Sequence, residues 1–247
     1  MLKRGQVTIF IIIAILIVAV VVSYFVIFEG NIQANKIPKN LEPIYQRVEE
    51  CLELTSEEAL IYIGQYGGYY NVPESIALDY FGEKIPYYYL DNQENIPEKE
   101  RIELELNNYT NDKIENCLNF EDFISQGLNI SSGKPEILTL IKENSVKFSM
   151  NYLLAVSMED ETQVLKEFNV VAPFNINELL DSSKEIVDDY SKEPGVLCIS
   201  CLNEISIKNE INISSIFFEN NTIITISSEG LEGNNKNKLN WVFAMGK

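Results

Sequence analysis

The pattern of hydrophobic and polar positions divides the chain into three stretches. The first is an uninterrupted apolar run from Val7 to Phe28, which contains no charged residue, no Pro and no Gly. An α-helix rises about 1.5 Å per residue, so roughly 20 apolar residues cross a hydrocarbon core about 30 Å thick. The run therefore predicts a transmembrane helix over residues 7–28, which would contact the lipid bilayer directly.

The second stretch, residues 43–127, contains two segments with helical spacing. From Pro43 the apolar positions step by three and four as far as Ile63, and three glycines follow within the next five residues. This spacing predicts an amphipathic helix that the glycines end. Pro97 is expected to open a second helix, which would end around residues 120–127.

The tyrosine-rich segment between these two helices is the most unusual composition outside the apolar run. Short β-prone runs on either side of Gly82 predict a hairpin, and Pro86 would confine its second strand to a sheet edge. Tyrosine offers a large amphipathic area at low entropy cost, so an exposed cluster favours binding of a protein or a glycan. The alternative is that the tyrosines fill half-buried strand positions. The candidate binding surface comprises Tyr69, Tyr70, Tyr87, Tyr88 and Tyr89.

The third stretch, residues 128–247, is dominated by strand-like patterns separated by short polar turns. One helix is expected over residues 175–192, because Asn175 and Glu178 have capping-box spacing and Pro194 stands just beyond the end. Strands are expected at residues 137–141, 146–156, 164–171, 198–207, 211–218, 222–227 and 239–245.

Together these patterns predict an α+β fold in which antiparallel sheets carry about three helices on one face. Short turns between strands require antiparallel pairing, and helices cover the apolar face of such sheets. The expected organisation is a short cytoplasmic N-terminus (1–6), a transmembrane helix (7–28), a linker (29–42), a helix–hairpin–helix region (43–127) and a mostly antiparallel β region (128–247).

The residues around the apolar run predict its orientation. Lys3 and Arg4 precede the run, and the positive-inside rule then keeps the N-terminus cytoplasmic and places everything after Glu29 outside the cell. A cleaved secretory signal has a shorter apolar core and a small-residue cleavage site, and the exit from this run offers no small residue at the needed spacing. We therefore expect a single-pass protein of the cell membrane with an extracellular C-terminal domain.

The opening string from Lys3 to Phe10, Lys-Arg-Gly-Gln-Val-Thr-Ile-Phe, resembles the class III signal peptide of archaeal type IV pilin-like proteins. It also resembles the start of archaeal single-pass membrane proteins of unknown function. The first resemblance implies cleavage between Gly5 and Gln6 and self-assembly through the apolar helix. The chain departs from pilins at Phe10, where pilins often have Glu, and at Gly30, where the helix pattern breaks.

Composition and charge exclude several classes of function. The chain has 19 Lys and Arg against 37 Asp and Glu, a net charge of −18, which repels nucleic acid. Histidine is absent, so Ser-His-Asp and Cys-His mechanisms are excluded. The sequence contains no Asp-x-Asp-x-Asp-Gly loop for calcium. We predict no cofactor, no metal site and no catalytic residues, which leaves paired carboxylates as the one conceivable catalytic apparatus.

The four cysteines are expected to form disulfides, because their number is even and the domain would be exported to an oxidising compartment. A bridge between Cys51 and Cys117 would tie the two predicted helices together. Cys198 and Cys201 have the spacing of a redox pair, which requires the first Cys at a helix N-terminus, whereas their flanks look strand-like. A local structural disulfide is the favoured interpretation; a redox pair, a zinc site and buried free thiols are the alternatives.

These observations lead to three functional hypotheses. The leading one is a membrane-anchored extracytoplasmic binding or structural domain that is not an enzyme. The second is a type IV pilin-like filament subunit processed between Gly5 and Gln6. The third is an extracytoplasmic carboxylate-dependent hydrolase, for which the sequence selects no pair of acids.

Overall fold

The computed structural model describes residues 37–158, 161–229 and 238–247. The predicted transmembrane helix (7–28), the Gly5–Gln6 bond and most of the predicted linker lie outside these residues. Among the helices that the structure describes, none combines the length and apolarity needed to cross a bilayer. Residues Pro43–Lys247 form one compact unit. In the preceding unit, Leu41 donates its backbone N–H to the carbonyl of Pro38, closing a turn.

Helix α2 (Glu42–Gln65) confirms the first predicted helix. Its buried positions follow the expected stripe from Ile44 to Ile63. The chain leaves the helix through Gly67 and Gly68, which have φ angles of 49° and 89°. Gly64 permits a close approach to strand β10 (Lys238–Met245), because a Cβ there would lie 2.4 Å from the carbonyl oxygen of Asn240.

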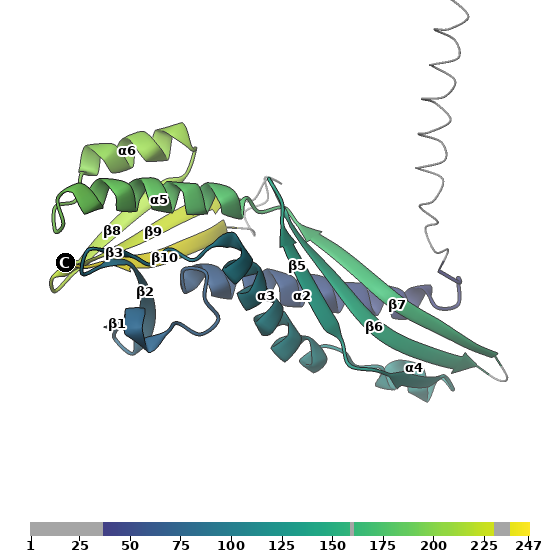
Figure 1. The fold of residues 1–247 in the computed structure, drawn as a ribbon. Helices are drawn as coiled ribbons and strands as arrows, with labels where there is room; N and C mark the ends of the chain where they lie inside the picture. The colour runs from purple at the N-terminus through teal and green to yellow at the C-terminus, as the bar shows by residue number, and fades with distance from the viewer. Residues whose placement is uncertain (1–36, 159–160, 230–237) are drawn as a thin grey trace, which may run out of the picture. The chain divides into compact units, whose positions relative to one another are not determined.

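The larger sheet has six strands in the order β1-β2-β10-β9-β8, with a short strand β3 also paired to β2. Its hairpin half consists of β1 (Ala77–Tyr80), β2 (Glu83–Leu90) and β3 (Gln93–Glu94), and a single 3₁₀ turn, η1 (Glu74–Ile76), precedes β1. Its C-terminal half consists of β8 (Asn212–Phe218), β9 (Asn221–Glu229) and β10. Thus strands from both predicted regions of the chain share one sheet (Figure 1).

Two expectations about this sheet are wrong. Strands β2 and β10 pair in parallel, with Ala244 opposite Tyr87, because strands so far apart in sequence need no tight turn between them. Pro86 does not confine β2 to an edge. It is the last residue paired with β1, and the pairing with β10 begins at Tyr87. The missing N–H of Pro86 therefore falls where β2 changes partner.

The smaller sheet is built on the long strand β6 (Val146–Met158). Strands β4 (Asn129–Ser132) and β5 (Glu136–Ile141) pair with it on one side, and β7 (Glu161–Ala172) pairs on the other. All pairings are antiparallel, as predicted. Burial alternates along β5 and β6, which gives the sheet one buried and one exposed face.

Helix α3 (Lys99–Lys113) covers the free edge of β5 with its own polar side chains. The backbone N–H groups of Ile137, Thr139 and Ile141 donate to Asn111 Oδ1, Asn107 Oδ1 and Glu103 Oε1 at 3.1, 2.7 and 2.8 Å. Four helical residues rise about 6 Å and two strand residues about 6.8 Å, so the two spacings match closely. This edge ladder satisfies N–H groups that an edge strand otherwise leaves unpaired.

The segment after α3 contains a short 3₁₀ turn, η2 (Ile114–Asn116), and helix α4 (Glu121–Ser125). Cys117 follows η2 and is bonded to Cys51 of α2, with 5.6 Å between their Cα atoms. The predicted bridge between the two helical segments is therefore confirmed.

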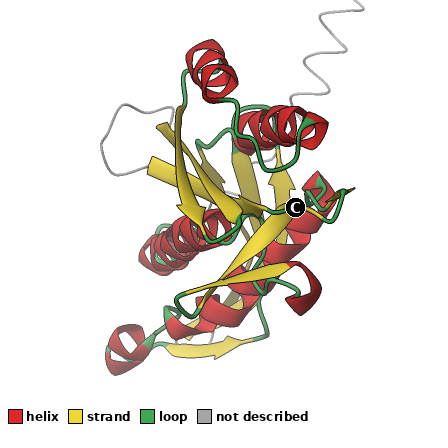
Figure 2. Ribbon diagram, turned by 90° about the vertical axis from the view of Figure 1, so that its left-hand side faces the viewer, coloured by secondary structure: helices red, strands yellow, loops and turns green. Residues whose placement is uncertain are grey.

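Helix α5 (Ile176–Lys192) confirms the predicted helix and its cap, because Asn175 Oδ1 accepts the backbone N–H of Glu178 at 3.1 Å. The predicted strand at residues 198–207 is wrong, since this segment is helix α6 (Ile199–Lys208). Leu202 and Ile205, three positions apart, face the interior. Figures 1 and 2 show α6 beside α5, to which Lys208 and Asn209 connect it by polar contacts. The fold is α+β, with one antiparallel and one mixed sheet.

Candidate functional site

Tyr88, one of the five candidate binding-surface tyrosines, lies in the interior, as the alternative interpretation of buried strand positions expects. Its hydroxyl donates to the carbonyl of Gly67 at 2.9 Å and accepts the indole N–H of Trp241 at 2.8 Å. Its ring stacks on Phe243 with 4.4 Å between centroids. Complete burial raises the pKa of Tyr88 well above its usual value. This side chain is a core element that joins the end of α2 to β10.

Three more of the predicted surface tyrosines are also buried. Tyr87 donates its hydroxyl to Asn221 Oδ1 at 3.0 Å, Tyr89 packs edge-on against Tyr190 of α5, and Tyr69 lies under the guanidinium of Arg101. The prediction of an exposed surface is therefore wrong for four of the five tyrosines. For Tyr87, Tyr88 and Tyr89 the reason is that β2 lies inside its sheet, with β10 on one side and β1 and β3 as its other partners, so its aromatic side chains fill the core. Tyr69 precedes the hairpin and is covered by Arg101.

Tyr70 is the one predicted tyrosine that keeps partial exposure. Its ring belongs to a cluster with Tyr62 and Tyr109, at centroid distances of 5.7 and 5.2 Å. Its hydroxyl donates to Asp112 at 2.7 Å, and this hydrogen bond raises the pKa of Tyr70. Tyr66, beside Tyr62, likewise donates to a carboxylate. These phenols are fixed by the protein's own acids.

An exposed aromatic surface does exist, at the tip of the β1–β2 hairpin. Tyr80, Phe81 and Phe218 contact one another, with ring centroids 4.9 to 5.6 Å apart; we call these three residues the aromatic patch. Phe81 is 84% exposed. Ile216, two positions before Phe218 on β8, is also exposed. Strand and hairpin thus bring together apolar side chains that are far apart in sequence.

The backbone at Phe81 is unusual for a large side chain. Phe81 and Gly82 have φ angles of 54° and 91°, the pattern of a two-residue hairpin turn in which Asn-Gly is favoured. Asp79 Oδ1 accepts the N–H of Gly82 at 3.0 Å and helps to hold the turn. A phenylalanine in this left-handed region carries a conformational cost of about 1–2 kcal/mol. The turn therefore presents Phe81 to solvent at the expense of stability.

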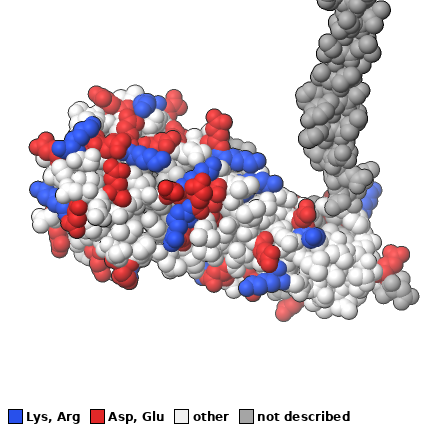
Figure 3. Space-filling view, in the orientation of Figure 1, with Lys and Arg blue, Asp and Glu red and all other residues white. Residues whose placement is uncertain are grey.

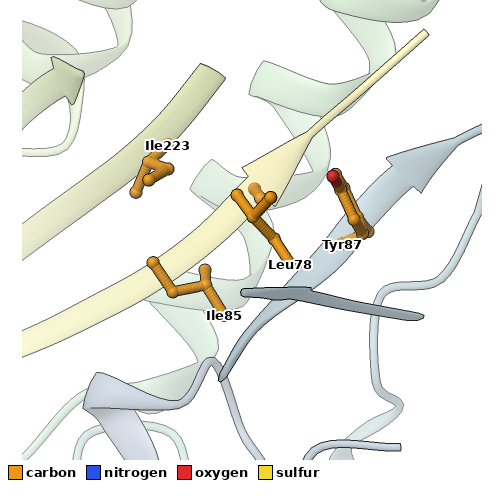
Figure 4. Packing of buried hydrophobic residues seen from close by; sticks show 5 residues of the cluster. Leu78, Ile85, Tyr87 and Ile223 are labelled. Atoms are coloured by element: carbon orange, nitrogen blue, oxygen red, sulfur yellow. The ribbon is translucent and has the colours of Figure 1, made fainter. Parts of the chain in front are cut away.

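The aromatic patch rests on a buried apolar cluster. Leu78, Ile85, Tyr87, Ile223 and Ala244 form this cluster, and Figure 4 draws their side chains, with the four labelled ones coming from β1, β2 and β9. Tyr80 and Phe218 pack against it from the side of the patch. Since protein interiors are close-packed, this base fixes the partly buried rings of Tyr80 and Phe218, which Phe81 contacts in turn.

The outer face of the smaller sheet has an open hollow of about 470 Å³. Glu136 and Glu167 line it from β5 and β7, and each lies opposite Asn151 of β6. Beside this row, Ser149 donates to Asn169 Oδ1 at 2.8 Å. Both carboxylates are exposed, whereas a general acid of a glycosidase is typically held in an apolar pocket. The hollow offers polar contacts rather than a catalytic environment.

Cys198 and Cys201 form the second predicted disulfide. The Asp189 carboxylate of α5 lies with both sulfurs in one group whose ligand atoms are within 4.8 Å of one another. Such a group resembles a metal site by residue type, but metal ions bind thiolates, and both sulfurs are joined in the disulfide. The cluster offers a metal ion only the carboxylate in this state.

No protein-family model matches the chain, and neither the curated proteins nor the solved structures searched include a match.

Sequence reasoning missed the aromatic patch because Phe218 and Tyr80 are separated by more than half the chain. One local signal was present. Phe81 precedes Gly82 at a turn where Asn or Asp is the favoured partner of glycine. A large apolar side chain in such a place indicates a role outside folding.

Proposed function

We propose that this protein is a membrane-anchored module that binds a protein partner outside the cell through the aromatic patch. The observation that carries the proposal is Phe81, a large apolar side chain that is almost fully exposed at a backbone position unfavourable to it. A residue that costs stability and contributes little packing is better explained by binding than by folding.

The energetics of the patch suit a protein interface. Full burial of one phenylalanine side chain contributes about 1.5–3 kcal/mol, and aromatic residues dominate the few positions that carry most binding energy. The rigid base beneath Tyr80 and Phe218 reduces the entropy lost on binding. Two or three such rings therefore give a small, fixed anchor for an apolar pocket on a partner.

Charge narrows the class of partner. The chain carries a net charge of −18, and Figure 3 shows acidic and basic side chains interspersed over the visible face. Anionic lipid headgroups and nucleic acids would be repelled by the net charge. We therefore favour a protein whose apolar pocket has a neutral or basic rim.

Support for the membrane anchor comes from the sequence. The apolar run of residues 7–28 has the length of a bilayer crossing, and Lys3 and Arg4 precede it. In this proposal the anchor fixes the binding domain close to the outer surface of the membrane.

Site-specific photo-crosslinking tests the binding surface. A photoreactive phenylalanine analogue would replace Phe81 in the full-length protein, produced in its native cells. The control places the same analogue at Ile207, which is 71% exposed on α6. We expect one or a few discrete protein adducts from position 81 and none of these from position 207. Equal yields of the same adducts at both positions, or no adduct at position 81, would refute the proposal.

A filament subunit is the second candidate, favoured by the pilin-like string around Gly5 and Gln6. The mass of the intact native protein separates it from a plain anchor. Loss of residues 1–5 supports processing and assembly, whereas a retained N-terminus rules out the pilin-like route.

A further inference from the structure

The helix that replaces a predicted strand changes the chemistry of the Cys198–Cys201 pair. Cys198 is the N-cap residue of α6, and its Sγ accepts the backbone N–H of Cys201 at 3.2 Å. The Ser200 hydroxyl lies 3.4 Å from the same sulfur, within hydrogen-bond distance. Helix α6 contains ten residues, and among the N–H groups of its first turn the Cys201 N–H already points to Sγ of Cys198. The N–H groups of the helix N-terminus favour a thiolate at Cys198, whereas the Asp189 carboxylate, within 4.8 Å of both sulfurs, opposes it.

The two disulfides of the protein differ in their access to other molecules. Cys198 and Cys201 are both partly exposed, whereas in the other disulfide Cys117 is partly exposed and Cys51 is 2% exposed. Thiol–disulfide exchange requires a thiolate to approach one sulfur in line with the bond, so access decides which disulfide reacts. Both residues of the Cys198–Cys201 pair are open to attack, whereas the Cys51–Cys117 bridge can be approached only from the side of Cys117.

The closed loops also differ in what they contribute to the fold. The bridge between Cys51 and Cys117 spans a sequence separation of 66 residues and joins α2 to the end of the α3 segment. In the chain-entropy model such a loop stabilises by about 4 kcal/mol. The Cys198–Cys201 bridge spans a separation of three residues, mostly within the first turn of α6, and constrains little of the unfolded chain. Its stabilising role is therefore small, and a chemical role explains its position better.

We propose that Cys198 and Cys201 form a redox-active disulfide that accepts electrons from protein dithiols outside the membrane. A thiolate of the substrate attacks Sγ of Cys198, the Cys198–Cys201 bond breaks, and the Cys201 sulfur leaves as a thiolate. The second substrate thiolate then attacks the substrate sulfur of the mixed disulfide and releases the Cys198 thiolate. Two electrons and two protons pass to the pair: the substrate dithiol becomes a disulfide, and Cys198 and Cys201 become thiols.

The surroundings assign different parts to the two sulfurs. Cys198 Sγ receives the hydrogen bond from the Cys201 N–H, so its thiolate is the better stabilised and the better leaving group in the second step. The Asp189 carboxylate is close to both sulfurs and can accept a hydrogen bond from the Cys201 thiol that forms when the bridge opens. Lys192, which forms an ion pair with Asp189 at 3.3 Å, holds that carboxylate in place.

A redox titration of the full-length wild-type protein tests the proposal without any mutation. The protein is equilibrated with mixtures of reduced and oxidised dithiothreitol, alkylated, and analysed by peptide mass for each cysteine pair. We expect Cys198–Cys201 to be half reduced at a reduced-to-oxidised ratio at least tenfold lower than Cys51–Cys117 requires, a difference of about 30 mV. Equal ratios for the two disulfides, or a higher ratio for Cys198–Cys201, would overturn the proposal.

A second measurement asks whether the pair exchanges with another dithiol through the expected sulfur. In a Cys201→Ser variant, Cys198 should be trapped in a mixed disulfide when oxidised glutathione is added, and the matched Cys198→Ser variant should react at least tenfold more slowly. Equal rates would contradict the role given to the helix N-terminus. Because the redox pair and the aromatic patch are separate, Phe81→Ala should leave the titration unchanged even if it abolishes partner binding.

Discussion

The edge ladder between α3 and β5 gives the sharpest prediction for stability. Asn107→Ala removes the acceptor for the backbone N–H of Thr139, a donor–acceptor distance of 2.7 Å. Thr139 is 1% exposed, so water has little access to the N–H that points to α3 once the amide is lost. The variant therefore leaves a buried donor unpaired while the helix and the strand stay in place.

The magnitude follows from two opposed effects. An unpaired buried donor costs about 1–3 kcal/mol. Alanine is the better helix former, and this offsets up to about 0.7 kcal/mol of the loss. The matched control is Asn108→Ala, which makes the same change at the next position of α3, where the side chain is exposed. The difference between the two variants cancels the helix propensity and leaves about 1–3 kcal/mol for the hydrogen bond.

Thermal and chemical denaturation of the protein measure this difference. For a domain of roughly 200 residues, 1–3 kcal/mol lowers Tm by about 2–12 °C relative to the Asn108→Ala control. Amide hydrogen exchange should show faster exchange at Thr139 in Asn107→Ala and unchanged exchange in the control. Asn107→Asp keeps an acceptor oxygen at the Oδ1 position and should recover most of the stability lost in Asn107→Ala.

Some results would refute the reasoning about the ladder. If Asn107→Ala and Asn108→Ala differ by less than about 0.5 kcal/mol, the hydrogen bond contributes no more than a surface contact. An unchanged exchange rate at Thr139 would show that the N–H finds another acceptor. Either outcome would mean that α3 covers the edge of β5 only by packing.

Three further predictions concern other parts of the fold. Gly64→Ala should lower the free energy of unfolding by about 1–3 kcal/mol, because the added Cβ would lie 2.4 Å from a carbonyl oxygen of β10. The control Gly133→Ala, where the added Cβ makes ordinary contacts, should change the free energy of unfolding little. Equal effects of the two substitutions would contradict the close approach at Gly64. Phe81→Asn should be about 1 kcal/mol more stable than Phe81→Ala, since Asn tolerates a φ of 54°, and a reversed order would remove the argument for strain. The hydrogen bond to Glu83 raises the pKa of Tyr66 to about 12. The stabilising effect of this hydrogen bond should therefore be complete below pH 10 and be lost as the pH rises towards 12. In absorbance titrations, the difference between the wild type and Tyr66→Phe should contain no component that titrates near pH 10.

Where one periodicity clearly dominated, the sequence predicted the local structure. The stripe from Ile44 to Ile63 gave α2, and the alternation along Val146–Met158 gave β6, because each element buries a single face. The capping-box spacing of Asn175 and Glu178 located the start of α5. Residues 198–207 were misread because Ile205 and Ile207 fit period two as well as a helix, and ten residues offer too few positions to decide.

The candidate site was predicted only in part. The disulfide pairing was correct, since one pair is local and the other joins two predicted helices. The predicted exposure of the tyrosines was wrong, because the burial of β2 depends on β10, a parallel neighbour from the far end of the chain. The sequence predicted neither the aromatic patch nor the edge ladder. Each depends on two elements being neighbours in space, and no local sequence pattern specifies which elements become neighbours.

What the sequence determined by itself is therefore local or compositional: the apolar run of residues 7–28, the net charge, the absence of histidine, and the elements with one clear period. Tertiary structure decided which strand lies inside the larger sheet, which tyrosines are buried, and that Cys198 begins a helix. The physical reason is that periodicity specifies which face of an element is apolar, whereas its neighbours specify what covers that face and which side chains are left to meet solvent.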